Sequence, residues 1–347
     1  MKIPIANVYY LLCYAWGHAE ERDVVSLGDV GRFERFHDLF GKVLAQGTFQ
    51  LLHRGLDRGY REIQDDVAGI RGKLEVSEMV KRALRSRGRA ACLYEELSHD
   101  VLHNQILRST LRDLLGVPDL DQEVRAQVRT AFRRMDGVNI IRVTRQAFRQ
   151  VQLDRNRRVY RFLLAVCALI HERLLVDQAD GRVLFRDFRD DDQRMWKLFE
   201  AFVTEFYRKE QTTYRVASQR KIPWHDASAA VEGDLARIPA MWADVVLESR
   251  ERRIILDAKF YETALDGPFG ARKLRSVNLY QLLAYLRNRQ AREPVGPPHE
   301  GVLLYPVVEE PLAVEVRLEG FRIRARGVDL AQEWTRIHQD MLDVVMQ

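Results

Sequence analysis

Residues 241–262 read MWADVVLESRERRIILDAKFYE, and this stretch decides the fold of the second half of the chain. Two runs rich in β-branched and other apolar residues flank a short polar segment, so the stretch predicts a β-hairpin. If its turn is centred between Arg250 and Glu251, cross-strand partners have residue numbers that sum to 501. Asp244 then lies opposite Asp257 on the same face, with Cβ atoms roughly 5 Å apart. Two carboxylates at that spacing need a compensating cation.

Lys259 follows Asp257 by two residues and shares its face, because strand side chains alternate. Buried acids are costly unless a cation compensates them. One such cation is Mg²⁺ or Mn²⁺, held by the carboxylates of Asp244 and Asp257, the backbone carbonyl of Ala258 and waters. This ion would activate water against a phosphodiester, with Lys259 orienting the water or stabilising the developing charge. The alternative is an ordinary hairpin in which Lys259 forms a salt bridge with one acid, and a slip of one residue in the register would break the geometry.

Two predicted helices flank the hairpin and add polar groups to this site. The helix at 194–210 has an apolar stripe of period 3.6, and Glu200 at its edge either helps to hold a metal or is a solvated boundary residue. The helix at 276–289 places Gln281 and Tyr285 on one face at i and i+4. These two side chains either hydrogen-bond a DNA backbone or a metal-bound water, or leave the Tyr285 hydroxyl in solvent.

The first half of the chain predicts a helix-rich region with short strands. Glycines punctuate the segment 55–74, which predicts turns and short strands. The polar passage 181–192 marks a domain boundary, with domains at 1–189 and 190–347. The remaining expected elements are a strand at 302–305, ended by Pro306, and helices near 8–15, 33–54, 76–87, 101–115 and 330–345.

The basic residues of the chain are mostly arginine. The chain has 46 Arg and 9 Lys against 50 acids, and the net charge of +5 names no partner. Between residues 125 and 161 there are eleven arginines and two acids. Arg125, Arg129 and Arg133 form one stripe on a helix. Such a stripe is either a solvated face that reflects codon usage, or a surface that meets phosphates or an acidic partner.

The three cysteines are far apart and form no CxxC pair, and no apolar run is long enough to span a membrane. Both features favour a cytoplasmic protein.

One motif favours a different class of protein. His99 and His103 are spaced four apart, and Glu123 follows twenty residues later, which mimics a zinc metalloprotease. Asp100 stands where the general-base glutamate belongs, and a shorter acid reaches a zinc-bound water poorly. We therefore expect these histidines to be surface or core residues.

The polar residues singled out above occur in the order of a known nuclease core. Glu200, Asp244, the triplet 257–259 and the Gln281-x-x-x-Tyr285 helix together resemble the PD-(D/E)xK superfamily, and the last motif resembles its RecB-like branch. Alanine stands where a proline would precede the first aspartate. Along nearly its whole length the chain resembles the McrC family, on the segments IPIANVYYLLCYAW (3–16), GIRGKLEVSE (69–78), EELSHDVLHNQIL (95–107), LFEAFVTEFY (198–207), ILDAKFYE (255–262), NLYQLLAYL (278–286) and GVLLYP (301–306).

The McrC resemblance implies a fold and a division of labour. The fold is an α+β N-terminal region followed by an α/β, restriction-endonuclease-like core of PD-(D/E)xK type. Residues 190–347 would act as the Mg²⁺-dependent endonuclease subunit of a type IV, 5-methylcytosine-directed restriction system that serves in phage defence. Its catalytic residues would be Glu200, Asp244, Asp257 and Lys259.

The same resemblance implies partners. Residues 1–189 would dock on an McrB-like AAA+ GTPase hexamer and stimulate it. GTP would be bound by that partner, since this chain has no GxxxxGK[ST] loop. We expect the segment 55–74 to enter the ring, with Arg58 and Arg71 acting on the partner's nucleotide site; alternatively, it is a hairpin packed on its own domain. The substrate would be methylated double-stranded DNA, cut where two McrC copies meet.

Two other interpretations stay open. The chain is either a stand-alone RecB-like DNA nuclease, or a non-catalytic activator and scaffold for a GTPase.

Overall fold

The computed structural model describes residues 3–20, 33–154, 156–176, 183–185, 191–228, 233–261, 265–266, 273–307 and 311–346. These residues form two compact units. One contains the described residues from 35 to 185, and the other combines residues 3–20 with the described residues from 191 onward. The expected domain of 1–189 therefore needs a correction at its start, because the first helix belongs to the second unit.

The reason for this placement is the packing of α1 (Ile5–Ala15) against α9 (Asp192–Glu210). Tyr14 lies edge-on to Phe202 at 5.6 Å and also contacts Phe206 at 5.6 Å. The Tyr14 hydroxyl also donates a hydrogen bond to Glu210, the last residue of α9. An apolar pattern predicts that α1 is a helix, but it does not say on which unit the helix packs.

A mixed six-stranded sheet forms the core of the unit that contains α1 and α9. Its strand order is β12-β13-β11-β8-β7-β6. The β7–β8 hairpin has the predicted register, with Val245 opposite Leu256 and Val246 opposite Ile255. The strands are β6 (Arg215–Ile222), β7 (Met241–Glu248), β8 (Arg253–Ala258), β11 (His299–Val307), β12 (Ala313–Leu318) and β13 (Phe321–Asp329).

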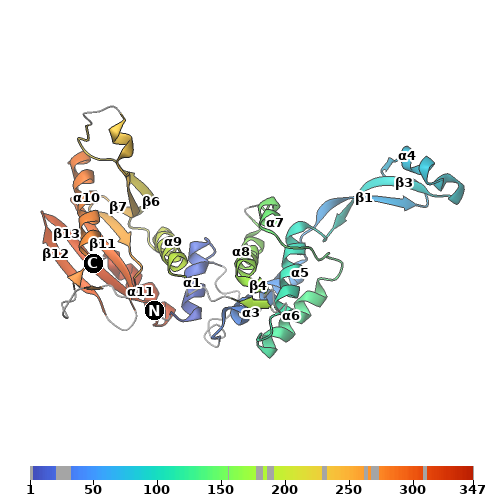
Figure 1. Ribbon diagram of the computed structural model, residues 1–347, viewed down its shortest axis with the longest axis horizontal. Coiled ribbons are helices and arrows are strands. Elements are labelled where there is room, and N and C mark those ends of the chain that lie inside the picture. Colours follow the sequence, from blue (N-terminus) through green and yellow to red (C-terminus); the bar gives the residue numbers. More distant parts are fainter. Residues whose placement is uncertain are drawn as a thin grey trace. The chain divides into compact units, whose positions relative to one another are not determined.

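Helix α10 (Ser276–Arg292) connects the parallel neighbours β8 and β11 and packs on both (Figure 1). Its buried Leu282 and Leu286 share a core cluster with Ile255 and Leu303 of the sheet. Helix α9 packs against β6, β7 and β8. The unit is completed by α11 (Trp334–Met346), η3 (Asp234–Arg237), β9 (Leu265–Asp266) and β10 (Lys273–Leu274).

Strand β11 continues through Pro306, where the sequence predicted its end. A proline removes one backbone donor and is usually excluded from central strands. The pairing of β11 with β8 stops at Leu304 opposite Ala258, so from there on β11 pairs only with β13. Pro306 is tolerated because its missing N–H would have had no partner strand on that side.

The other unit is a helical bundle in which α3 packs against α5, α6 and α8. The sequence predicted the ends of α3 and α5 to within three residues. None of the helices in the described part of the chain is long and apolar enough to cross a membrane. The elements are α3 (Phe36–Arg54), α5 (Leu102–Leu115), α6 (Gln122–Arg134), α7 (Arg145–Gln150), α8 (Arg158–Arg173), β4 (Leu174–Val176) and β5 (Val183–Phe185).

Residues 59–98 form an arm that extends from this bundle (Figure 1). It is a three-stranded sheet of order β1-β3-β2 with a short helix at its far end. The predicted helix at 76–87 is divided into two short helices, and the long first and third strands were not predicted. The elements are β1 (Gly59–Val67), β2 (Lys73–Leu74), α4 (Val76–Lys81), η2 (Leu84–Arg87) and β3 (Ala90–Ser98).

Candidate active site

The two aspartates of the hairpin meet where β7 and β8 end their pairing. Asp257 is only 1% exposed, and its Oδ1 atom has no hydrogen-bond partner. Asp244 Oδ2 accepts a hydrogen bond of 2.9 Å from the backbone N–H of Ala258. This bond ties β7 to the residue that follows Asp257, as the predicted register requires.

Lys259 provides the positive charge beside these acids. Its Nζ lies 2.6 Å from Asp257 Oδ2 and donates a 2.9 Å hydrogen bond to Gln281 Oε1. The Gln281 Nε2 atom in turn donates to the Tyr285 hydroxyl at 2.5 Å. Gln281 and Tyr285 therefore hold the lysine head in place from α10.

The peptide group between Ala258 and Lys259 has a defined direction. Its N–H, that of Lys259, donates to Leu304 O on β11 at 2.8 Å. The N–H and C=O of one trans peptide point in opposite directions, and the described chain has no cis peptide. The Ala258 carbonyl therefore points away from β11, toward the side on which Asp244 lies.

Glu200 of α9 is the third carboxylate of the site. It is half-buried, and its Oε1 atom accepts a hydrogen bond from the side-chain amide of Gln219 on β6. Its charge and that of Asp257 influence each other. The sequence placed Glu200 at the edge of the core, and the structure confirms that position, but nothing in the sequence singled out Gln219.

Burial and mutual repulsion change the protonation of this cluster. Burial, followed by the charges of Asp257 and Glu200, raises the pKa of Asp244 to about 7. Burial also raises the pKa values of Asp257 and Glu200, and the contacts with Lys259 and Gln219 oppose this change. Burial lowers the pKa of Lys259, but the charge of Asp257, the hydrogen bond to it and the charge of Asp244 together outweigh burial, so the lysine pKa lies above its ordinary value. The one charged lysine of the site therefore does not neutralise its three carboxyl groups.

This arrangement fits a divalent cation. The protein side chains alone would not fill the coordination sphere, because within the described ranges no group of three or more His, Cys, Asp or Glu side chains is placed to hold a metal ion. The oxygens available are those of Asp244 and Asp257, including the unpartnered Asp257 Oδ1, and the carbonyl of Ala258. Two carboxylates, one carbonyl and waters make the sparse all-oxygen set that Mg²⁺ accepts.

A second polar network lies behind the site and was not predicted. Tyr285 is 4% exposed. The alternative in which its hydroxyl lies in solvent is therefore wrong. Asn278, two turns before Tyr285 on α10, donates to the Tyr305 hydroxyl at 3.1 Å and accepts from Tyr261 at 3.3 Å. The only sequence signal for this network is that Asn278 and Tyr285 share a helix face at i and i+7.

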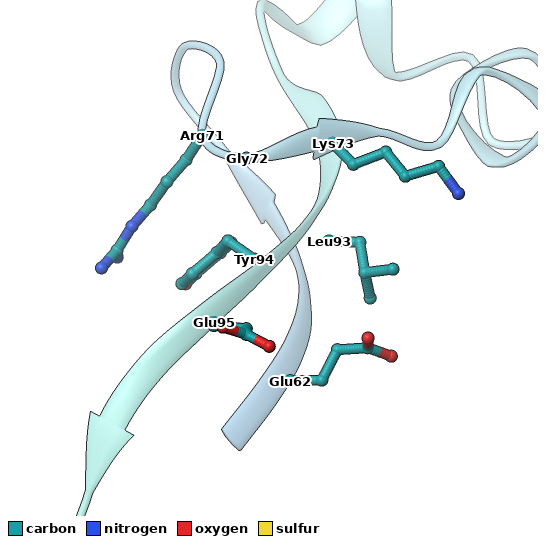
Figure 2. A pocket seen from close by; sticks show the side chains of 7 residues that line it. All are labelled: Glu62, Arg71, Gly72, Lys73, Leu93, Tyr94 and Glu95. Atoms are coloured by element: carbon teal, nitrogen blue, oxygen red, sulfur yellow. The ribbon is translucent and has the colours of Figure 1, made fainter. Parts of the chain in front are cut away.

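The structure places the two arginines of segment 55–74 at different levels of the arm. Arg58 lies at its base and donates from Nε to His99 Nε2 at 3.0 Å. Arg71 precedes β2, and its guanidinium stacks over the Tyr94 ring at 4.0 Å beside a pocket that Glu62 and Lys73 also line (Figure 2). The structure therefore does not bring these two arginines into one site.

The zinc-protease interpretation of His99 and His103 is wrong. Helix α5 begins at Leu102, so the two histidines do not share a helix face. His103 Nε2 lies 2.9 Å from Asp57 Oδ2, while Glu123 lies 3.6 Å from Lys42. Both histidines belong to the polar contacts at the base of the arm.

The basic stripe on α6 is also smaller than the sequence suggested. Arg125 donates to the carbonyl of Leu115, the last residue of α5, and to that of Val117 just beyond it, so it has a structural role. Arg129 and Arg133 remain exposed.

Comparison with known proteins gives concordant matches. Residues 6–306 match the family described as McrBC 5-methylcytosine restriction system component. The chain is 32% identical over 344 residues to the Type IV methyl-directed restriction enzyme EcoKMcrBC of Escherichia coli (strain K12), covering 99% of this chain and 97% of that protein.

Two solved structures are also similar. One is the half-complex of Thermococcus gammatolerans McrB AAA+ hexamers with bound McrC, with a TM-score of 0.61, 19% identity, and coverage of 99% of this chain and 76% of that one. The other is the Thermococcus gammatolerans McrBC complex, with a TM-score of 0.43, 23% identity, and coverage of 61% and 60%. The first match shows that the fold is shared over nearly the whole chain.

Proposed function

This chain belongs to the McrBC 5-methylcytosine restriction system component family, and we propose that it is the DNA-cleaving subunit of such a system. In this proposal, residues from 191 onward form a PD-(D/E)xK endonuclease core that hydrolyses methylated double-stranded DNA. The unit of residues 35–185 docks on an McrB-like AAA+ GTPase hexamer and stimulates its GTP hydrolysis. GTP binds to that partner.

The observation that carries the nuclease proposal is the convergence of Asp244, Asp257 and Lys259 at the end of one hairpin. Lys259 Nζ contacts Asp257 at 2.6 Å, and the Ala258 N–H joins Asp244 to the same strand end at 2.9 Å. A structural salt bridge would need one acid for one lysine. Here the acids outnumber the lysine, which supports a site that takes up a divalent cation.

The proposed reaction is hydrolysis of a phosphodiester. A water oxygen bonds to phosphorus, one P–O ester bond breaks, and the leaving oxygen takes up a proton. Mg²⁺ or Mn²⁺ would be held by Asp244, Asp257 and the Ala258 carbonyl, and would supply a polarised phosphate and a more acidic water. Lys259, held by Gln281, places a fixed positive charge where negative charge develops on the phosphate.

The nuclease proposal is tested with Asp257→Asn, which keeps the side-chain shape and removes the charge. We expect cleavage of methylated DNA in the presence of Mg²⁺, GTP and the AAA+ partner to disappear, whereas stimulation of the partner's GTPase persists. Asp234→Asn is the matched control, because Asp234 is a partly exposed aspartate of the same unit. Loss of both activities, or of neither, would contradict the division of labour.

The same assay separates the two other interpretations. Cleavage by the isolated chain without the partner would favour a stand-alone RecB-like nuclease. A wild-type chain that stimulates the GTPase but never cleaves would favour a non-catalytic activator. The intact set of Asp244, Asp257 and Lys259 supports the active enzyme. Because one such site cuts one strand, we also propose that two copies meet to cut both.

We propose that the arm, residues 59–98, is the part that docks on the AAA+ partner. Its strands are exposed along much of their length, and Tyr60, Ile70, Val76 and Val80 are each more than 60% exposed. Exposed apolar side chains on a projecting element are typical of a protein interaction site.

Arg71 is an arm residue well placed for such an interaction, because its guanidinium is ordered by stacking on Tyr94 at 4.0 Å and by the carboxylate of Glu96, whose Oε1 lies 4.0 Å from Nη2. We expect Arg71→Ala to weaken GTPase stimulation, whereas Arg87→Ala, at another exposed arginine of the arm, leaves it unchanged. Arg58 is a weaker candidate, since it already donates to His99. Equal GTPase stimulation by the Arg71 and Arg87 variants would remove Arg71 from the docking proposal.

A further inference from the structure

Gln219 occupies an unusual backbone position beside the acidic cluster. Strand β6 pairs with β7 through Ser218 opposite Val245 and Arg220 opposite Ala243, so Gln219 is level with Asp244. Its φ is +47°, in the left-handed region. Of the four non-glycine residues with positive φ in the described chain, the other three lie in turns, and Gln219 alone lies within a strand.

This conformation is unfavourable for glutamine and needs a compensating interaction. Left-handed backbone is uncommon for residues other than Gly, Asn and Asp. Strained positions persist where the surrounding structure holds them, and they cluster at functional sites. Here the residue occurs where β6 passes the candidate catalytic aspartate.

The side chain of Gln219 uses this position to reach α9. Its Nε2 atom donates to Glu200 Oε1. The structure gives Glu200 Oε2 no hydrogen-bond partner within the described residues, so one carboxylate oxygen is fixed and the other is available. An amide is well suited to this role, because it donates to a carboxylate without adding charge to a site that already contains Lys259.

We propose that Gln219 is a positioning residue that orients Glu200, so that the second Glu200 oxygen would accept a hydrogen bond from a water of the divalent cation site formed by Asp244 and Asp257. The inference rests on the proposed function and adds a residue to it. Gln219 acts through Glu200 and contacts neither the substrate nor the cation. Residues that orient metal-site groups in this way change metal affinity when they are replaced.

The test measures Mn²⁺ binding to the full chain by isothermal titration calorimetry, without DNA or partner. Gln219→Asn accepts the left-handed backbone more readily, but its amide is one methylene too short to reach Glu200. We expect its Mn²⁺ affinity to fall by about 10-fold. Gln219→Gly, which relieves the backbone and removes the amide, should behave in the same way, and both variants should keep the wild-type melting temperature or exceed it. Ser218→Ala, at the preceding residue of β6, is the matched control and should bind normally.

A double-mutant cycle shows whether Gln219 acts through Glu200. Once Glu200→Ala is present, adding Gln219→Asn should cause no further loss of Mn²⁺ affinity. Additive losses, or wild-type affinity in Gln219→Asn and Gln219→Gly, would overturn the positioning role. If wild-type chain binds no Mn²⁺, or if Asp257→Asn binds it normally, the proposed metal site fails and this inference fails with it. Failure of the positioning role alone leaves the Asp257→Asn effect in place.

Discussion

Lys259 Nζ lies 2.6 Å from Asp257 Oδ2, and only one residue separates the two in the sequence. Alternation along a strand brings residues i and i+2 to one face, so the Asp-x-Lys spacing builds this contact locally. The hydrogen bond from Lys259 to Gln281 then fixes the lysine head against α10. The short motif supplies the ion pair, and the helix supplies its orientation.

The first prediction concerns the charge of Lys259. Lys259→Met keeps most of the side-chain volume and removes the ammonium group, so we expect DNA cleavage to fall by about 10²-fold or more. Stimulation of the partner GTPase should be unchanged. Lys273→Met, at an exposed lysine of the same unit, is the control. The measurement is the cleavage rate in the full assembly with GTP and Mg²⁺, and an unchanged rate would assign Lys259 a purely structural role.

The second prediction concerns the pH dependence of stability, measured in EDTA. The pKa of Asp244 is raised to about 7, first by burial and then by the charges of Asp257 and Glu200. An acid whose pKa is higher in the folded state stabilises the fold fully below its unfolded pKa of about 4 and loses this contribution as the pH rises through about 7. The wild-type melting temperature should therefore fall between about pH 5.5 and about pH 8.

The matched variant for this experiment is Asp244→Asn, which has no proton to lose at this position. It should show a smaller decrease over the same pH interval, and it should melt at a higher temperature than wild type at the alkaline end. The same decrease in both proteins would mean that other groups cause the pH dependence.

The hairpin could be predicted because its determinants are local. A polar turn centred between Arg250 and Glu251 fixes the register of β7 and β8, and that register carries Asp244 opposite Asp257. The place of Gln281 and Tyr285 on one helix face could also be predicted, but the hydrogen bond from Lys259 to Gln281 depends on how α10 packs on the sheet.

The features that escaped prediction depend on contacts between distant parts of the chain. The packing of α1 on α9 joins residues that are nearly 200 positions apart. Gln219 has a left-handed backbone, which nothing about a glutamine in a strand leads one to expect. Strand β3 has a weak pattern of alternation, since only its first half is buried.

The third prediction uses two glycines of the arm with almost the same backbone. Gly72 has φ +67° and Gly88 has φ +66°, but a Cβ on Gly72 would lie 2.4 Å from Leu93 O, whereas one on Gly88 would meet nothing within 4 Å. Gly72→Ala should therefore separate β2 from β3, displace Arg71 and reduce GTPase stimulation. Gly88→Ala bears the same backbone strain without the clash and should retain stimulation. Equal loss in both would indicate that strain alone weakens the arm.

The last prediction concerns Asn104, which ties both ends of the arm to the bundle. Its buried Nδ2 donates to Asp57 O at 3.0 Å, before β1, and to His99 O at 2.8 Å, after β3, while its Oδ1 accepts from Tyr160 at 2.8 Å. Asn104→Ala leaves both carbonyls without this donor and should cost roughly 1–3 kcal/mol. Amide exchange at the base of the arm should accelerate and GTPase stimulation should fall, whereas Mn²⁺ binding by the other unit stays at the wild-type level. Gln127→Ala on α6 is the control, and unchanged exchange at the base in Asn104→Ala would show that the remaining contacts hold the arm.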